Sequence, residues 1–129
     1  MAKIRHILQY KYDPKIRVEL KEGENTIGRY RNNSIRLDDP LISRHHAKIT
    51  VNNGMCEIND LGSSNGTYVG KTRLDGSQLT ILINGMDVTF AGPSTLVEDK
   101  YQQAFSYTYR KEVESPKAEK KSLLSRMLS

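Results

Sequence analysis

Apolar and polar residues alternate with a period of two along most of the first hundred residues. Ile16, Val18 and Leu20 alternate with charged residues, and the same pattern recurs at residues 47–51, 56–58 and 88–90. Because successive side chains of a β-strand point to opposite faces, each run predicts a strand with one buried face. Dipeptides that supply positive φ angles for tight turns separate these runs: Glu22-Gly23, Asn53-Gly54, Asn65-Gly66, Asp75-Gly76 and Asn84-Gly85.

The predicted strands are short and numerous. They occupy residues 3–10, 15–20, 25–29, 34–37, 46–51, 55–59, 67–69, 72–74, 78–82, 86–91 and 94–99. Phe105, Tyr107 and Tyr109 also alternate, which predicts either one more edge strand or a segment lying against the others. Turns about 8–12 residues apart are typical of antiparallel sandwiches, and so many strands do not fit one flat sheet. We therefore predict an all-β, two-sheet antiparallel β-sandwich of about eleven strands.

Length and composition predict a single domain followed by a tail. The chain has 129 residues, 36% of them hydrophobic, and no Trp, so the core must be built from Ile, Val and Leu. The domain is predicted over residues 1–110, and residues 111–129 form a charged C-terminal tail. Two interpretations of the tail stay open: a flexible linker containing the kinase-type sequence Ser115-Pro116, or a docking segment formed by the apolar residues from Leu123 to Leu128.

The charge of the chain is concentrated in its last thirty residues. The formal net charge is +5, but residues 1–99 carry 13 Lys and Arg against 12 Asp and Glu. A nucleic-acid module usually has its basic excess on the folded part. This distribution argues against nucleic acid as a direct partner of the domain.

Cysteine usage and hydropathy predict a compartment. Cys56 is the single cysteine, which excludes an intrachain disulfide and fits a reducing environment. No apolar run approaches the ~20 residues of a membrane span, and residues 1–20 lack the apolar stretch of a signal peptide. We expect a soluble intracellular protein with no membrane partner.

Three short clusters carry the candidate chemistry. They are Gly28-Arg29, Ser43-Arg44-His45-His46 and Ser64-Asn65-Gly66-Thr67, and each lies beside an alternating run. Loops that connect strand ends gather at one rim of a sandwich, so these clusters are predicted to converge. A guanidinium, hydroxyls and a carboxamide suit a phosphate ester, and none of these groups is basic enough to hydrolyse it. The set predicts a binding site without catalysis.

The same residues allow other interpretations. Arg29 on its own is compatible with a solvated surface residue beside a bulge at Gly28. Ser43 and His46 are conceivable as a nucleophile and its base, but no Gly-x-Ser-x-Gly motif is present, and His46 better fits a structural role in which its ring nitrogens bind backbone. A metal site built from His6, His45, His46 and Cys56 is disfavoured because no ligand spacing recurs. We expect neither a metal nor a cofactor.

The order Gly-Arg, Ser-x-x-His and Asn-Gly-Thr on an all-β chain resembles a forkhead-associated (FHA) domain, over about residues 4–99. The resemblance implies a sandwich of the SMAD/FHA type whose loops grip a phosphothreonine peptide. It implies that Arg29 and Ser43 bind the phosphate, that Ser64 assists them and that Asn65 bonds the peptide backbone. Arg44 and Arg31 would add positive potential close to the phosphate. The resemblance assigns the remaining matched positions to the scaffold of the site: Gly28, His46, Gly66 and Thr67.

The expected function is phosphothreonine-dependent binding of a partner protein in signalling, with no enzymatic activity. A nuclear location and a role in the DNA damage response or cell cycle are the finer expectations. The alternative is an FHA-fold homodimer or scaffold in which the phosphate pocket is secondary. Leu41 stands two residues before Ser43, where some members of the family have an Arg that selects an acidic residue near the phosphothreonine. An aliphatic or different preference is therefore expected here.

Overall fold

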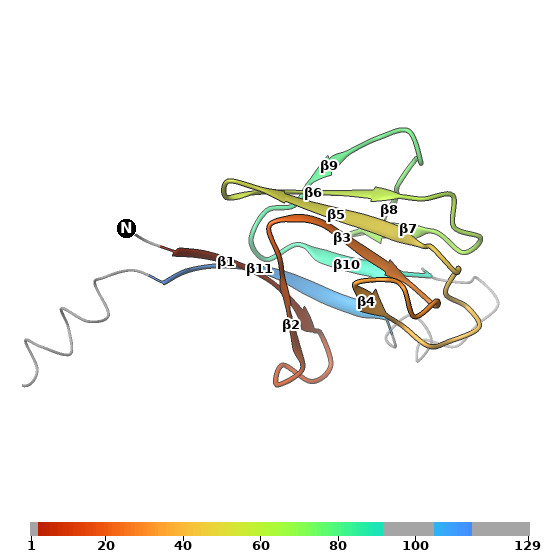
Figure 1. Ribbon diagram of the computed structural model, residues 1–129, viewed down its shortest axis with the longest axis horizontal. Helices are drawn as coiled ribbons and strands as arrows, with labels where there is room; N and C mark the ends of the chain where they lie inside the picture. Colours follow the sequence, from red (N-terminus) through yellow and green to blue (C-terminus); the bar gives the residue numbers. More distant parts are fainter. Residues whose placement is uncertain (1–2, 92–104, 115–129) are drawn as a thin grey trace, which may run out of the picture.

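The protein is a sandwich of two β-sheets (Figure 1). The computed structural model describes residues 3–91 and 105–114, in which there are eleven strands. The predicted strand at residues 94–99 and the tail from residue 115 onward, with Ser115-Pro116 and the Leu123–Leu128 segment, lie outside the described residues. No helix in the described part of the chain is long and apolar enough to cross a membrane.

The larger sheet is antiparallel throughout. Its six strands run in the order β2 (Arg17–Leu20), β1 (Lys3–Tyr10), β11 (Ser106–Glu114), β10 (Asp87–Phe90), β7 (Thr67–Val69) and β8 (Thr72–Arg73). The first and last strands of the described chain therefore lie side by side in the middle of this sheet.

The smaller sheet is mixed. Its order is β4 (Ile35–Arg36), β3 (Gly23–Gly28), β5 (Ala47–Asn52), β6 (Met55–Asp60) and β9 (Thr80–Ile81). Among these strands only β3 and β4 pair in parallel. The loop after β3 reverses the chain, so that β4 runs beside β3 in the same direction. The all-β sandwich with about eleven strands is confirmed, with this one parallel pair added to an otherwise antiparallel arrangement.

The last described strand differs most from the prediction. The ten strands before residue 92 begin and end within two residues of the predicted bounds. β11, however, is an interior strand between β1 and β10, so the edge position considered for residues 105–109 was wrong. β11 also continues to Glu114, and residues 111–114, assigned to the charged tail by composition, pair with residues 3–6 of β1. Alternation reports which face is buried, but it carries no information about which strands are the neighbours.

The core lies between the two sheets. It combines aliphatic side chains with Phe90, Tyr107 and Tyr109, which are all nearly or fully buried. The Tyr109 hydroxyl lies 2.5 Å from Nδ1 of His6, so the two buried polar groups satisfy each other. Burial raises the pKa of the neighbouring Cys56 thiol to about 11, which keeps it protonated and unreactive near neutral pH.

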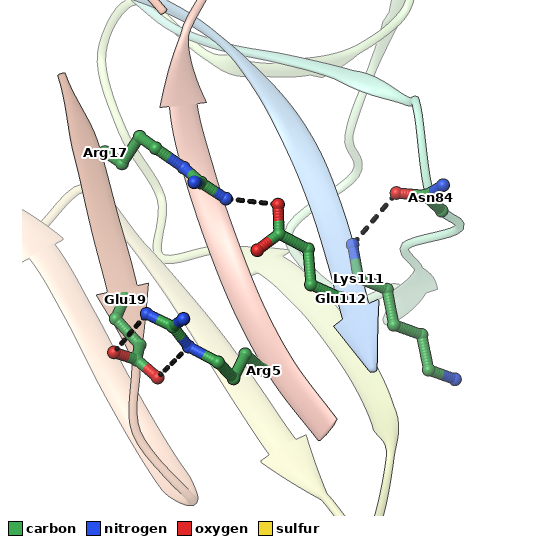
Figure 2. Close-up of polar contacts among 6 residues, drawn as sticks. All are labelled: Arg5, Arg17, Glu19, Asn84, Lys111 and Glu112. Atoms are coloured by element: carbon green, nitrogen blue, oxygen red, sulfur yellow. Dashed lines mark hydrogen bonds and ion pairs between the residues drawn. The ribbon is translucent and has the colours of Figure 1, made fainter. Parts of the chain in front are cut away.

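Two ion pairs lie on the outer face of the larger sheet, Arg5 with Glu19 and Arg17 with Glu112 (Figure 2). Ile7 is 2% exposed although it points away from the core, on the face opposite to Leu8. Arg5 makes a bidentate pair with Glu19, and Arg17 pairs with Glu112 across β1. Since Arg17 is in register with Gln9, and Glu112 with Arg5, the second pair crosses β1 at Ile7. The aliphatic parts of these long side chains shield it from water.

We expect Tyr109→Phe to destabilise the fold. The substitution leaves Nδ1 of buried His6 without its hydroxyl partner, and such an unsatisfied group typically costs about 1–3 kcal/mol. Urea denaturation measures the change in the free energy of unfolding. Tyr12→Phe, which alters a half-exposed tyrosine, should change it by less than about 0.5 kcal/mol, and equal effects of the two variants would contradict this role of Tyr109.

Candidate functional site

Three loops meet at one end of the sandwich and enclose a depression of about 620 Å³. They are the loop after β3, the loop between β4 and β5, and the loop between β6 and β7. The residues that line it are Arg29, Tyr30, Pro40, Leu41, Ile42, Ser43, Arg44, His45, Leu61, Gly62, Ser64 and Asn65. The structure thus brings together five of the six side chains expected to contact a phosphopeptide. The sixth, Arg31, is exposed and does not line the depression.

Arg29 is anchored through one side of its guanidinium. Its backbone amide donates to the carbonyl of Ser43 at 3.0 Å, and its Nε donates to the carbonyl of Ile42 at 3.1 Å. Within the described part of the chain, its two terminal nitrogens have no hydrogen-bond partner. The guanidinium is therefore held in place while its paired donors stay available in the depression.

Tyr30 organises the positive charge of the site, and sequence reasoning missed it. The guanidinium carbons of Arg29 and Arg44 lie 5.8 and 5.7 Å from the centre of its ring, within the range of cation–π contacts. Arg44 Nη1 also lies 3.4 Å from the Tyr30 hydroxyl. One exposed aromatic ring thus holds two cations close to the same depression. A tyrosine directly after an arginine gives no sequence signal for this arrangement.

The serines and Asn65 tie the second loop to the third. The backbone amide of Ser64 donates to Oγ of Ser43 at 3.0 Å. Nδ2 of Asn65 donates to the carbonyl of Leu41 at 2.8 Å. Since Ser43 Oγ accepts this bond, its own hydroxyl proton remains available for a ligand.

His46 is buried beneath the loops and binds backbone on both sides. Its Nδ1 accepts from the amide of Ser43 at 3.1 Å, and Nε2 lies 2.7 Å from the carbonyl of Gly66. An amide donor at Nδ1 requires the proton to be on Nε2, which then donates to Gly66. Burial lowers the pKa of His46, so the ring is neutral near pH 7. Both ring nitrogens are bonded to backbone groups, so neither nitrogen is available to activate the Ser43 hydroxyl.

The other histidines do not form a metal centre with it. His6 is bonded to Tyr109, and His45 Nδ1 lies 3.3 Å from Oδ1 of Asn33. Within residues 3–91 and 105–114, no three His, Cys, Asp or Glu side chains are grouped so as to hold a metal ion.

Asp60 shapes the third loop, and it too was missed. Its carboxylate accepts from the amides of Gly62 and Ser63 and from the hydroxyls of Ser63 and Thr67, at 2.5 to 2.9 Å. Burial acts to raise the pKa of Asp60, but these hydrogen bonds outweigh it and lower the pKa. An Asp followed by small residues at positions two and three is an Asx-turn signal that could have identified it.

Close backbone packing explains the glycine before Arg29. A Cβ on Gly28 would lie 2.2 Å from the carbonyl oxygen of Arg44 and 2.7 Å from Nδ2 of Asn33. Buried Asn33 uses that nitrogen to bond the carbonyls of Tyr30 and Arg44, both at 2.8 Å. The first loop is thus locked against the second. In the third loop, Gly66 has a φ of +87°, which a side chain would strain.

Comparison with known proteins matches this arrangement to one family. A family model described as the FHA domain matches residues 25–91. The oxoglutarate dehydrogenase inhibitor of Corynebacterium glutamicum is 44% identical over 52 residues, which cover 40% of this chain and 36% of that protein. The glycogen accumulation regulator GarA of Mycobacterium tuberculosis is 36% identical over 69 residues, covering 54% and 41%. The matched stretch spans less than half the length of these curated relatives.

Two solved structures share the fold over most of this chain. One, from a structural and functional analysis of phosphothreonine-dependent FHA domain interactions, has a TM-score of 0.65 and 25% identity, and covers 82% of this chain and 95% of that one. The other is Mycobacterium tuberculosis EmbR in complex with a low affinity phosphopeptide. Its TM-score is 0.65 at 26% identity, and the match covers 82% of this chain and 24% of that one.

We expect Gly28→Ala to destabilise the protein and to separate the first two loops. Because the added methyl would meet the backbone oxygen of Arg44, relief requires a backbone shift, and such overpacking typically costs about 1–3 kcal/mol. Gly76→Ala is the matched control, since the nearest atom to its Cβ would be 3.6 Å away. Thermal and urea denaturation measure both variants, and equal stability of the two would contradict the close packing.

Stability should fall when the pH drops below 6.5. The pKa of His46 is lowered by burial from its ordinary value of 6.5, and burial and Lys111 lower that of His6. Between the folded pKa and 6.5 the unfolded chain binds more protons, so the stabilisation present above pH 6.5 is lost as the pH falls. Each histidine contributes a slope of at most about 1.4 kcal/mol per pH unit.

Urea denaturation between pH 7.5 and 5 measures this dependence. His46→Gln should reduce the slope of the unfolding free energy against pH, because His6 is then the one buried histidine left. His45→Gln changes an exposed residue and should leave this slope unchanged. A slope unchanged in His46→Gln would show that His46 is not buried as a neutral ring.

Proposed function

The chain belongs to the FHA domain family, and on that premise we propose that it is a phosphothreonine reader. It binds a partner protein or peptide through a phosphorylated threonine that enters the depression between the three loops. The observation that carries the proposal is the anchored Arg29, whose terminal nitrogens have no hydrogen-bond partner among the described residues and which lines the same depression as Ser43 and Ser64.

The donors around the depression match the needs of a phosphate ester. A phosphothreonine brings about −1.5 to −2 charges and three acceptor oxygens. Arg29 supplies a charged fork, Ser43 and Ser64 supply neutral donors, and Arg44 adds a second cation. Asn65, held by its bond to the Leu41 carbonyl, would bond the peptide backbone beside the phosphate. No metal is needed to balance the charge.

The rim of the depression supports a preference for an apolar flanking residue. Leu41 and Leu61 line it, and Leu61 is exposed. An aliphatic peptide side chain would be shielded from water by these residues. Burying the γ-methyl of threonine contributes only ~0.8 kcal/mol to the binding free energy. A strong preference for phosphothreonine over phosphoserine would therefore also require a restricted side-chain rotamer.

A binding role without catalysis is supported by the neutral, fully bonded His46 and by the curated relatives. Two of these are described as an inhibitor and as a regulator of glycogen accumulation. Those relatives come from bacteria, which gives no support to the nuclear location or to the DNA damage response expected from the resemblance.

Arg29→Ala should abolish measurable binding of phosphothreonine peptides selected from an oriented library. Truncating one partner of a buried charge-assisted pair typically costs about 2–5 kcal/mol, which a short peptide does not compensate. Isothermal titration calorimetry measures the affinity for the phosphorylated and the unphosphorylated peptide. Arg29→Lys should recover only a small part of the affinity for the phosphorylated peptide, because the ammonium lacks the paired donors of the guanidinium.

Arg31→Ala is the matched control for this experiment. It removes the same charge two residues away, from a side chain outside the depression, and should lower the affinity only slightly through long-range electrostatics. Unchanged binding by Arg29→Ala, or equal binding of peptides with and without phosphate, would overturn the proposed function.

A further inference from the structure

The edge strand β9 lacks the protection that the other sheet edges carry. Within the described residues the two sheets end in β2, β8, β4 and β9. Charged side chains lie on the first three, including Arg17, Arg73 and Arg36, and such charges hinder pairing with another strand. Residues 78–84, which contain β9, have neither a charged residue nor a proline. β9 lies at the free margin of its sheet beyond β6 (Figure 1).

The outward face of this edge is apolar. Leu79, Ile81 and Ile83 alternate with residues that point inward, and they are 61%, 50% and 61% exposed. Glu57 of β6 is in register with Ile81, and continuing this register places Met55, which is 49% exposed, opposite Ile83. Leu79, Ile81 and Ile83 therefore form an exposed apolar row along the edge, with Met55 of β6 next to Ile83.

The backbone of the edge is also open. The amide of Leu82 donates to Cys56 of β6 at 2.8 Å, and Thr80 is in register with Ile58. Alternate residues of a strand direct their backbone groups to opposite sides, so those of Leu79 and Ile81 point away from β6. No hydrogen bond from the described residues reaches these four groups. The open edge ends at Ile83, because both of its backbone groups bond Met86. The carbonyl of Ile83 accepts from the amide of Met86, and the amide of Ile83 donates to Sδ of Met86.

We propose that β9 pairs with β9 of a second copy of this chain, in an antiparallel and two-fold symmetric arrangement. Pairing of Leu79 with Ile81 of the other copy, and of Ile81 with its Leu79, places Thr80 on the symmetry axis and forms four backbone hydrogen bonds. The same register brings two leucines and two isoleucines together on the outer face.

Charge and symmetry select a second copy as the occupant. The segment is uncharged, and residues 1–99 have a formal net charge of only +1, so two copies meet without strong repulsion. A two-fold interface requires a surface that complements itself, and an antiparallel strand pair centred on Thr80 meets this requirement. The dimer would carry two phosphate-binding depressions, which increases avidity for a partner with two phosphothreonines. The inference does not depend on the proposed function.

Sedimentation velocity of the full chain over a range of concentrations tests the proposal. The wild type should shift from monomer to dimer as the concentration rises. Ile81→Lys, and independently Leu79→Lys, should weaken the dimer by about tenfold or more, because an ammonium would lie in the apolar centre of the contact. Ile16→Lys is the matched control: Ile16 is also 50% exposed but precedes β2, and its substitution should leave dimerisation unchanged.

Hydrogen exchange identifies the contact directly. The amides of Leu79 and Ile81 should be protected at high protein concentration and exchange freely at low concentration. A wild type that is monomeric at every concentration, or an Ile16→Lys variant as defective as Ile81→Lys, overturns the proposal. Protection of these amides in the monomer would overturn it too, because the chain itself would then cover β9. Phosphopeptide binding by Ile81→Lys should match the wild type, so a failure of this inference can be distinguished from a failure of the proposed function.

Discussion

One buried, neutral imidazole holds together the loops at the end of the sandwich that carries the depression. His46 accepts from Ser43 in the second loop and donates to Gly66 in the third, so a single ring fixes the spacing of two loops that are twenty residues apart in sequence. In the interior each of these bonds is costly to leave unmade. The position of Ser43, and through its hydroxyl that of Ser64, therefore depends on a side chain that is fully buried.

The site divides its polar groups between internal support and ligand binding. Asp60, Asn33 and His46 form hydrogen bonds within the protein. Among the described residues, the Arg29 guanidinium hydrogen-bonds through Nε, and Ser43 Oγ accepts one bond. These two side chains keep N–H and O–H donors, which an anion requires. Because the supporting bonds already restrict these side chains, less conformational entropy is lost when a phosphate binds. Two cations against Tyr30 complete a field that favours negative charge.

Alternation and turn dipeptides are sufficient to predict ten strands, because in a half-buried strand every second residue is apolar and faces the core. The three clusters were predicted to meet because loops at one rim of a sandwich are close in space. What the sequence did not reveal depends on long-range register: β11 in the middle of its sheet, the ion pairs over Ile7, and Arg31 lying outside the depression. Tyr30 was missed because its role exists only once two arginines flank it in three dimensions.

A crystal structure of the protein with a phosphothreonine peptide would show where the phosphate binds. We expect phosphate oxygens bonded to the terminal nitrogens of Arg29 and to the hydroxyls of Ser43 and Ser64. His46 should still bridge Ser43 and Gly66. A phosphate bound elsewhere, or loops that rearrange so that His46 loses these partners, would show that the depression is not the binding site.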